Sequence, residues 1–326
     1  YYALPFLSNK EGKPSGAVFG FANIILKLLQ EEKPDYFVVA FDHARRTFRN
    51  EIYREYKMQR KPAPEELISQ FPIIKQMLVA MGVKYFEQEG IEADDIIGTL
   101  SNQFKGEKII LSGDRDLLQL IDEDTTVWLT KKGVSEVDKV DENRLQELFG
   151  LKPYQNIELK ALMGDASDNI PGVKGVAEKT ALSLLEKFQT IDNIYENIED
   201  VSGKLKEKLV EDKDMAFVSK TLATIKRDCN INVDFEECSY KIPFSKELYD
   251  FFEQWNFSSL LKNKNLFQEK KESSVKIERI KLTENDLKEI VFNGDYFSYD
   301  LKTLEFFING KYYYLDKNYS LFENPL

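Results

Sequence analysis

The residues Tyr36-Phe37-Val38-Val39-Ala40-Phe41-Asp42 form a short apolar run that ends in an aspartate. Such a run predicts a buried strand. A second run, Lys108-Ile109-Ile110-Leu111-Ser112, predicts another, and Asp114 follows it at the start of the next helix. Around these runs the apolar spacing predicts a strand at 83–86 and helices at 16–32, 65–81 and from about 93. Alternating strands and helices at this spacing predict an α/β fold with a parallel sheet.

The composition limits the classes of protein to which the chain can belong. Hydrophobic residues make up 42% and charged residues 31% of the 326 residues, which is enough for a folded core and about two domains. The net charge of −11 argues against a protein that coats DNA or anionic membranes by bulk charge. Two cysteines argue against a disulfide scaffold and favour a reducing compartment, and one histidine excludes a His/Cys zinc site.

The second half of the chain has a different pattern. Three further helices are predicted, at 155–163, 178–187 and 203–226, with a Pro/Gly-rich turn at Pro171–Gly175. Polar, lysine-rich residues 262–276 are predicted to form a linker. Beyond it we expect an incomplete α+β segment with these elements: a helix at 283–292, a strand at 296–300, and a hairpin of 304–308 and 311–315.

Eight acidic residues gather at four places: Asp42; Glu92, Asp94 and Asp95; Asp114 and Asp116; and Asp165 and Asp168. Three of the four groups follow a predicted strand, so we expect them to converge on one edge of the sheet. Each group alone is also explained as a helix cap. Together, eight carboxylates would repel one another unless cations neutralised them. Mg²⁺ prefers oxygen ligands and meets phosphates, so the pattern predicts two-metal phosphodiester chemistry.

Residues 43–63 carry seven Arg and Lys side chains against two Glu side chains. Aromatic residues lie among these cations, which suits phosphate contact and base stacking, although a solvated helix face would show the same charges. The Gly172-Val173-Lys174-Gly175 turn leads into a helix, where backbone amides can approach a phosphate. A plain tight turn between helices is the alternative.

Five ordered motifs carry a resemblance to a known family: Val39-Ala40-Phe41-Asp42; Phe48-Arg49 with Tyr56-Lys57 and Arg60; Glu92-Ala93-Asp94-Asp95; Ser112-Gly113-Asp114-Arg115-Asp116; and Gly164-Asp165-Ala166-Ser167-Asp168-Asn169-Ile170-Pro171-Gly172-Val173. They resemble the 5′-nuclease domain of bacterial DNA polymerase I, a member of the flap endonuclease family, over residues 1 to about 265. The resemblance implies a PIN-like nuclease core over 1–165 with a helical arch at about 43–63. It also implies a helix–three-turn–helix DNA-binding subdomain over 166–261.

The resemblance also implies roles for individual residues. Asp42, Glu92 and Asp94 would belong to one Mg²⁺ site and Asp114, Asp116 and Asp165 to a second, with Asp95 and Asp168 supporting or extending them; Mn²⁺ is an alternative metal. Lys57 and Arg60 would contact the scissile phosphate. The implied DNA contacts are Arg45, Arg49, Tyr56, Gly172, Val173, Gly175, Lys179 and Thr180, and a K⁺ ion would bind at the turn.

The chain departs from the family at three places. Ala177 stands where the family commonly has a third glycine. The chain starts at Tyr1-Tyr2, after the position of a family strand and metal-ligand aspartate, so we expect a fragment cut at both ends. Residues 277–326 resemble the start of a 3′-5′ exonuclease domain, but Lys302 replaces its second acid, which predicts a degenerate copy.

The resemblance therefore implies a Mg²⁺-dependent 5′-3′ exonuclease and flap endonuclease of a DNA polymerase I. It would be a cytoplasmic, nucleoid-associated monomer that acts on 5′ flaps, nicks and RNA primers in replication and repair. Three alternatives stay open: a non-catalytic remnant that binds branched DNA, a nuclease without a polymerase, and an aspartate-based phosphatase. The eight acids argue against the remnant, and the basic stretch argues against a small substrate.

Overall fold

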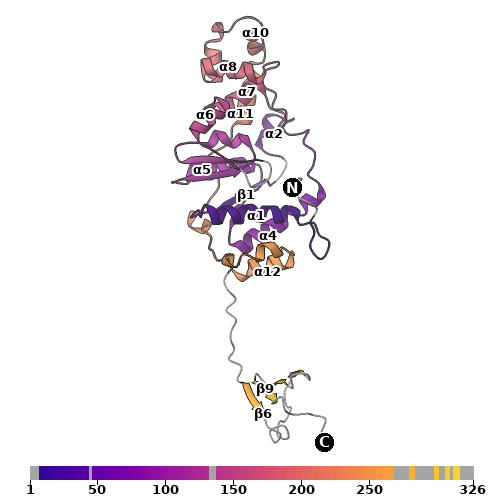
Figure 1. Cartoon of the computed structure of the whole chain (residues 1–326). Helices are drawn as coiled ribbons and strands as arrows, with labels where there is room; N and C mark the ends of the chain where they lie inside the picture. Colours follow the sequence, from indigo (N-terminus) through magenta and orange to yellow (C-terminus); the bar gives the residue numbers. More distant parts are fainter. Residues whose placement is uncertain are drawn as a thin grey trace. The chain divides into compact units, whose positions relative to one another are not determined.

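The computed structural model describes residues 7–43, 46–131, 137–267, 279–282, 297–300, 305–308 and 311–315. The chain divides into two units, Tyr1–Gln268 and Glu269–Leu326, and each is described by itself. The first unit holds the described acids and cations of the predicted site. At one end of this unit lie α1, α4 and α12, and at the other lie α8 and α10 (Figure 1).

The sheets of the first unit are built from short strands: β1 (Val38–Ala40), β2 (Lys84–Phe86), β3 (Lys108–Ser112), β4 (Thr125–Thr130) and β5 (Val137–Val140). Among the described residues, β1 pairs only with β2, in parallel, while β3 pairs with β4 in parallel and β5 joins β4 antiparallel. The strands predicted at 36–41, 83–86 and 108–112 are confirmed, and so is the parallel α/β character. The strands β4 and β5 were not predicted, although the Val-Trp-Leu run of β4 suits a strand.

The helices around these sheets are α1 (Gly16–Glu31), α2 (Phe48–Ile52), α3 (Glu65–Ile68), α4 (Phe71–Met81), α5 (Ala93–Gln103), the 3₁₀ helix η1 (Arg115–Leu120) and α6 (Glu142–Phe149). Later in the chain come η3 (Phe235–Cys238), α12 (Lys246–Gln254), α13 (Ser258–Leu261) and η4 (Lys264–Leu266). The apolar faces of α1, α4 and α12 share one core, centred on Leu29, Leu78 and Phe252. A second core joins β3, β4 and η1. The predicted helix 65–81 is two helices, because the chain turns at Ser69 and Gln70 ahead of Pro72.

Less of the basic stretch is helical than the predicted arch requires. Of its described residues, only Phe48–Ile52 are helical, and Tyr53 is extended with φ −139° and ψ 106°. Lys57 then adopts a left-handed conformation with φ 56°, and turns connect the two. This bend brings the Lys57 amide within 2.9 Å of the Asp168 carbonyl, so long-range contacts override local helix formation.

The second half of the first unit is helical: α7 (Gln155–Met163), α8 (Glu178–Phe188), α9 (Ile191–Glu196), η2 (Ile198–Asp200), α10 (Gly203–Glu211) and α11 (Lys213–Ala223). Their apolar faces form one core around Leu162, Leu185 and Leu209. The predicted helix 203–226 is broken at Asp212, which ends α10 and begins α11. Its carboxylate accepts the amide of Lys174 at 2.8 Å, so the break ties these helices to the glycine turn.

The described strands of the second unit are β6 (Arg279–Leu282), β7 (Phe297–Asp300), β8 (Glu305–Ile308) and β9 (Lys311–Leu315). They pair in the order β6-β9-β8-β7, and only the β6-β9 pair is parallel. The antiparallel pairing of β8 with β9 confirms the predicted hairpin, although its turn at 309–310 lies outside the described residues. The predicted helix 283–292 and Lys302 also lie outside them.

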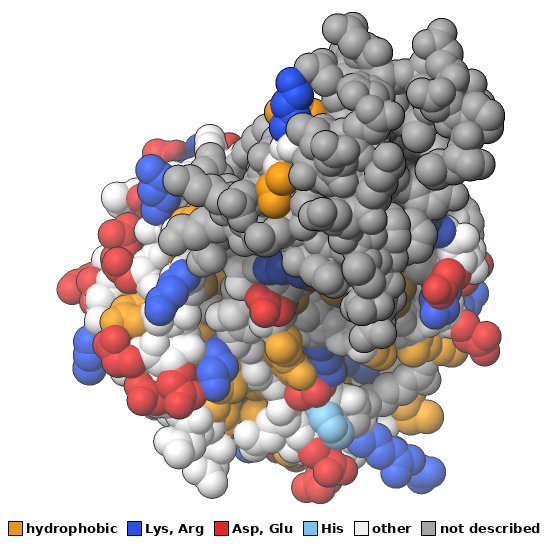
Figure 2. Space-filling model, turned by 90° about the horizontal axis from the view of Figure 1, so that it is seen from below, with side chains coloured by type: hydrophobic (Ala, Val, Ile, Leu, Met, Phe, Trp, Pro, Cys, Tyr) orange, Lys and Arg blue, Asp and Glu red, His pale blue; other side chains and the backbone are white. Residues whose placement is uncertain are grey.

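On the face shown in Figure 2, acidic and basic side chains are interspersed over the coloured part, with hydrophobic side chains between them. Over the described ranges, no helix combines the length and the apolar character that a membrane span requires.

Candidate metal and nucleic-acid site

Four of the predicted acids meet where β1, α5 and η1 begin or end. Asp42 follows β1, and its carboxylate accepts the Ala93 amide at the start of α5 at 2.8 Å. Glu92 is the N-cap of α5 and Asp94 lies in its first turn, while Asp114 caps η1. Burial, together with the carboxylates of Asp114, Glu92 and Asp42, raises the pKa of Asp94 to about 7 against the opposing effect of Lys57. These four carboxylates therefore share one electrostatic environment, which the fold leaves short of positive charge.

Lys57 lies between two of the predicted acids. Its Nζ is 2.9 Å from both Glu92 carboxylate oxygens and 3.6 Å from Asp168 Oδ2. Arg60 pairs with the other oxygen of Asp168. Asp168 itself is buried, so these two cations supply much of its compensation. The structure thus brings both predicted phosphate-contacting residues to the acids.

A second lysine, Lys160 of α7, pairs with both Asp116 and Asp165. Asp165 Oδ1 also accepts the amide of Ser167 at 2.7 Å and its hydroxyl at 2.6 Å. Burial opposes ionisation of Asp165, but Lys160 and Ser167 outweigh it and lower its pKa to about 2. Neither Lys160 nor Ser167 was predicted as a site residue. The sequence could have indicated Lys160, because a lysine in the last turn of a predicted helix lies close to the Asp165 and Asp168 loop that follows.

The donor chemistry of this region suits a divalent cation. In the part of the chain that the structure describes, no three or more acidic, Cys or His side chains are grouped so that they could hold a metal ion. Among the same residues, however, the eight carboxylates are opposed by only four cations, Arg49, Lys57, Arg60 and Lys160. Oxygen-only donors with an excess of negative charge are what Mg²⁺ prefers, so the residues present fit such an ion.

Arg49 lies inside the protein, contrary to the expectation that it contacts DNA. Its side chain is 2% exposed, and Nη1 and Nη2 bond the two Asp95 oxygens at 2.7 and 2.8 Å. Nη1 also reaches Glu92 at 3.5 Å, while Nε and Nη2 donate to the carbonyls of Leu222 and Thr224, both at 2.9 Å. All five N–H groups are therefore engaged.

Asp95 and Tyr56, like Arg49, are buried. Asp95 is fully buried, and its oxygens also accept the amides of Glu92 and Lys226. Tyr56 is 4% exposed, and its hydroxyl contacts the carboxylates of Glu92 at 3.1 Å and Asp168 at 3.4 Å. A ring enclosed in this way cannot stack on a base. Arg45, another predicted DNA contact, lies outside the described residues.

The glycine turn is only partly accessible. The Gly172 amide donates to Ser219 Oγ at 2.9 Å, and the Val173 amide donates to the Leu162 carbonyl at 2.8 Å. Both residues are buried, which leaves neither amide for a phosphate and contradicts their prediction as DNA contacts. Gly175 and Lys179 are exposed and Thr180 is half-buried. Ala177 caps α8 with φ −89°, a conformation that needs no glycine.

Replacing Gly172 with alanine is expected to destabilise the chain by roughly 2–4 kcal/mol. Gly172 has φ 64°, and an added Cβ would lie 2.2 Å from the backbone nitrogen of Gly164. At Gly175 the Cβ would meet only the flexible end of Lys208, so Gly175→Ala should cost about 1 kcal/mol. Urea unfolding followed by circular dichroism measures both. Equal losses of unfolding free energy in the two variants would contradict the close approach of the Gly172 and Gly164 backbones.

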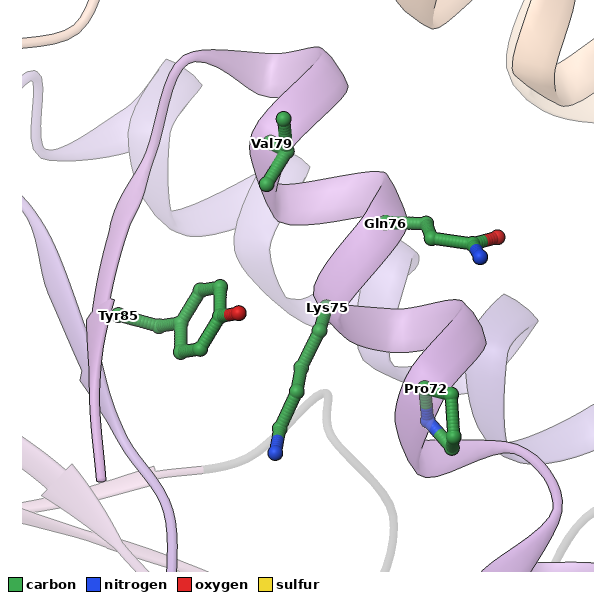
Figure 3. A pocket seen from close by; sticks show the side chains of 5 residues that line it. All are labelled: Pro72, Lys75, Gln76, Val79 and Tyr85. Atoms are coloured by element: carbon green, nitrogen blue, oxygen red, sulfur yellow. The ribbon is translucent and has the colours of Figure 1, made fainter. Parts of the chain in front are cut away.

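A pocket of about 390 Å³ lies between α4 and β2, and it is lined by none of the predicted site residues. Its lining residues are Pro72, Lys75, Gln76, Val79 and Tyr85, with the Tyr85 ring pointing from β2 toward α4 (Figure 3). The amine of Lys75 pairs with Glu87 at 2.5 Å. None of the five belongs to the acids or cations described above, so the pocket does not mark their site.

Comparison with known proteins places this arrangement in a family. Residues 1–150 match the family described as 5′-3′ exonuclease, N-terminal resolvase-like domain, and residues 151–246 match 5′-3′ exonuclease, C-terminal SAM fold. The chain is 44% identical to DNA polymerase I of Bacillus subtilis (strain 168) over 265 residues, which is 80% of this chain. It is 43% identical to DNA polymerase I of Caldicellulosiruptor bescii over 82% of this chain. It spans 30% and 32% of the lengths of these two relatives.

Solved structures show the same fold. T5 5′-exonuclease with bound divalent metal ions (zinc) matches with a TM-score of 0.56 and 22% identity, over 75% of this chain and 93% of that one. The catalytic core of Rad2 in complex with DNA substrate matches with a TM-score of 0.50 and 22% identity, over 74% and 81%. The described core thus has the α/β, PIN-like fold expected from the sequence. By the two family matches over residues 1–246, this chain belongs to the 5′-3′ exonuclease family.

Proposed function

We propose that the chain is a divalent-metal-dependent 5′-3′ exonuclease and flap endonuclease, and that it forms part of a DNA polymerase I. The observation that carries this proposal is the shared electrostatic environment of the buried Glu92, the half-buried Asp94 and the exposed Asp42 and Asp114, in which the negative charges raise the Asp94 pKa against the single opposing cation Lys57. Family membership supports the reaction class, and the similarity to DNA polymerases I supports the larger protein.

We propose that Asp42, Glu92 and Asp94 hold one Mg²⁺ and that Asp114, Asp116 and Asp165 hold a second. A bound pair would lower the pKa of the attacking water and stabilise the leaving oxygen of the phosphodiester. The similar T5 5′-exonuclease binds divalent metal ions, in that structure zinc, which supports a metal but not its identity. Mn²⁺ as a substitute, and K⁺ at the glycine turn, are further parts of the proposal.

We propose different roles for the remaining predicted residues. Lys57 and Arg60, which already face carboxylates, would neutralise the phosphate next to the cleaved bond. Arg49, Asp95 and Tyr56 would hold Glu92 in position rather than contact DNA. Arg49 and the Tyr56 hydroxyl bond the Glu92 carboxylate, and Asp95 accepts the Glu92 amide. At the turn, the exposed Gly175 and Lys179, with Thr180, would contact duplex phosphates.

The proposed substrates are DNA 5′ flaps, nicks and RNA primers, bound by a monomer in the cytoplasm near the nucleoid. The solved complexes of the bacteriophage T5 flap endonuclease and of Rad2 with DNA support DNA as the partner. Free Cys229 and Cys238 suit a reducing compartment. For the domains we propose a nuclease core over 1–165, a DNA-binding subdomain over 166–261, a linker over 262–276 and a degenerate exonuclease segment over 277–326.

A cleavage assay on a 5′-flap oligonucleotide tests the proposal directly. The full chain should cut near the junction in Mg²⁺ and should stop cutting in excess EDTA. A protein that binds the flap with unchanged affinity in both conditions but never cuts it would be the non-catalytic remnant.

Lys57→Ala is expected to lower the single-turnover cleavage rate by about 10²-fold while the affinity for flap DNA changes by less than about threefold. The reason is that the amine lies among the carboxylates and would act on the reacting phosphate rather than on the duplex. Exposed Lys61 offers a matched control, and Lys61→Ala should leave the rate within about twofold of wild type. A loss of affinity as large as the loss of rate would make this stretch a docking surface instead.

A further inference from the structure

The ion pairs of Lys160 are not explained by its helix alone. Its Nζ pairs with Asp116, in the first turn of η1, and with Asp165, in the loop that follows α7. The side chain is 22% exposed and the two acids are each 16% exposed, so solvent screens the pairs only in part. One lysine thus compensates two carboxylates that come from separate parts of the chain.

The hydrogen bonds of Asp165 show which of its oxygens Lys160 holds. Oδ1 accepts the amide and hydroxyl of Ser167 within its own loop, while Oδ2 faces the Lys160 amine at 2.5 Å. The loop therefore fixes Oδ1, and Oδ2 is the oxygen left for a cation. In this structure that cation is the ammonium group of Lys160.

We propose that Lys160 is an internal counter-ion that holds Asp116 and Asp165 together without metal and competes with Mg²⁺ for the same oxygens. This inference rests on the proposed function, in which these two acids are metal ligands. The ammonium group prevents the two carboxylates from repelling each other before metal binds. The same contact lowers the apparent affinity for Mg²⁺, because the metal must displace it.

The test measures Mg²⁺ binding by isothermal titration calorimetry and thermal unfolding in EDTA, both on the full chain. Lys160→Met and Lys160→Gln remove the charge, and the glutamine amide can still bond one carboxylate if the methionine variant does not fold. Both are expected to unfold at lower temperature in EDTA and to bind Mg²⁺ roughly tenfold more tightly than wild type. Lys160→Arg keeps the charge and should stay within about threefold of wild type.

Lys220 provides a matched control, because it also pairs with two acids. Its Nζ lies 2.9 Å from Glu158 and 2.5 Å from Asp192, and its side chain is 27% exposed. Lys220→Met should lower the unfolding temperature in EDTA but leave the Mg²⁺ affinity unchanged.

The outcomes separate this inference from the proposed function. Mg²⁺ affinity that is unchanged or weaker in both charge-removing variants would overturn the counter-ion role while leaving the metal site intact. If wild type itself bound no Mg²⁺, in the absence and in the presence of flap DNA, the proposed metal site would fail. Tightening in Lys220→Met as well would also overturn the inference, since the effect would then reflect net charge alone.

Discussion

Replacing Arg49 with methionine is expected to lower the free energy of unfolding by about 3–5 kcal/mol. The guanidinium is 2% exposed and joins α2 to Asp95 of α5 and to the carbonyls of Leu222 and Thr224. Its removal leaves the fully buried Asp95 carboxylate without its cation and leaves two carbonyls without these donors. Urea unfolding, followed by fluorescence of the buried Trp128 and Trp255, measures the loss.

Two further variants test whether the bidentate Arg49–Asp95 ion pair accounts for this loss of stability. Arg49→Lys keeps the charge but cannot form a bidentate ion pair with Asp95. Its free energy of unfolding should therefore lie between those of wild type and Arg49→Met. Arg144→Met removes a half-exposed arginine that pairs with exposed Glu147, and should cost less than about 1 kcal/mol. If Arg49→Met cost no more than Arg144→Met, the network around Asp95 would not hold α2 and α5 together.

Asp114→Asn and Asp165→Asn are each expected to reduce flap cleavage by about three orders of magnitude or more, with flap DNA still bound. Each change removes one negative ligand from the second proposed metal. Asp114 also adds to the charge that raises the Asp94 pKa, and Asp165 presents Oδ2 to the cation position. Single-turnover cleavage as a function of Mg²⁺ concentration measures the effect, and binding in Ca²⁺ or EDTA measures the affinity separately.

The control for these variants is an acid outside the predicted site. Asp124 is exposed and lies just before β4, so Asp124→Asn should cleave at a rate within about twofold of wild type. Wild-type rates in either Asp114→Asn or Asp165→Asn would remove that residue from the proposed metal site. A loss of rate that higher Mg²⁺ fully restores would instead indicate weaker metal binding with intact chemistry.

The sequence predicted the local elements well where apolar spacing is strong. The helix of residues 16–32 and the strand of residues 108–112 appear almost as expected, because each is specified by its own pattern of buried side chains. Long helices predicted across polar breaks were divided, as at Asp212, where a carboxylate bonds the amide of Lys174. A local pattern does not reveal such a distant partner.

Within the candidate site, the sequence supplied the residue types but not their directions. It grouped Arg49 and Tyr56 with Lys57 as surface contacts, since all three lie in one basic and aromatic stretch. The fold turns Arg49 and Tyr56 inward, whereas Lys57, at φ 56°, lies on a bend with its amine against Glu92. Whether a charge serves a ligand or the scaffold depends on burial, which neighbouring residues in the chain do not encode.

The sequence by itself determined the α/β class, the helical second half and the accumulation of carboxylates beside predicted strands. Only the tertiary structure decided which cation faces which acid, because all of these pairs except Lys160–Asp165 join elements that are distant in the sequence. Lys160 of α7 meets Asp116 of η1, and Arg49 of α2 meets Asp95 of α5, only after these elements have come together in the folded chain. Electrostatic energy depends on distance and burial, and both are set by packing rather than by order along the chain.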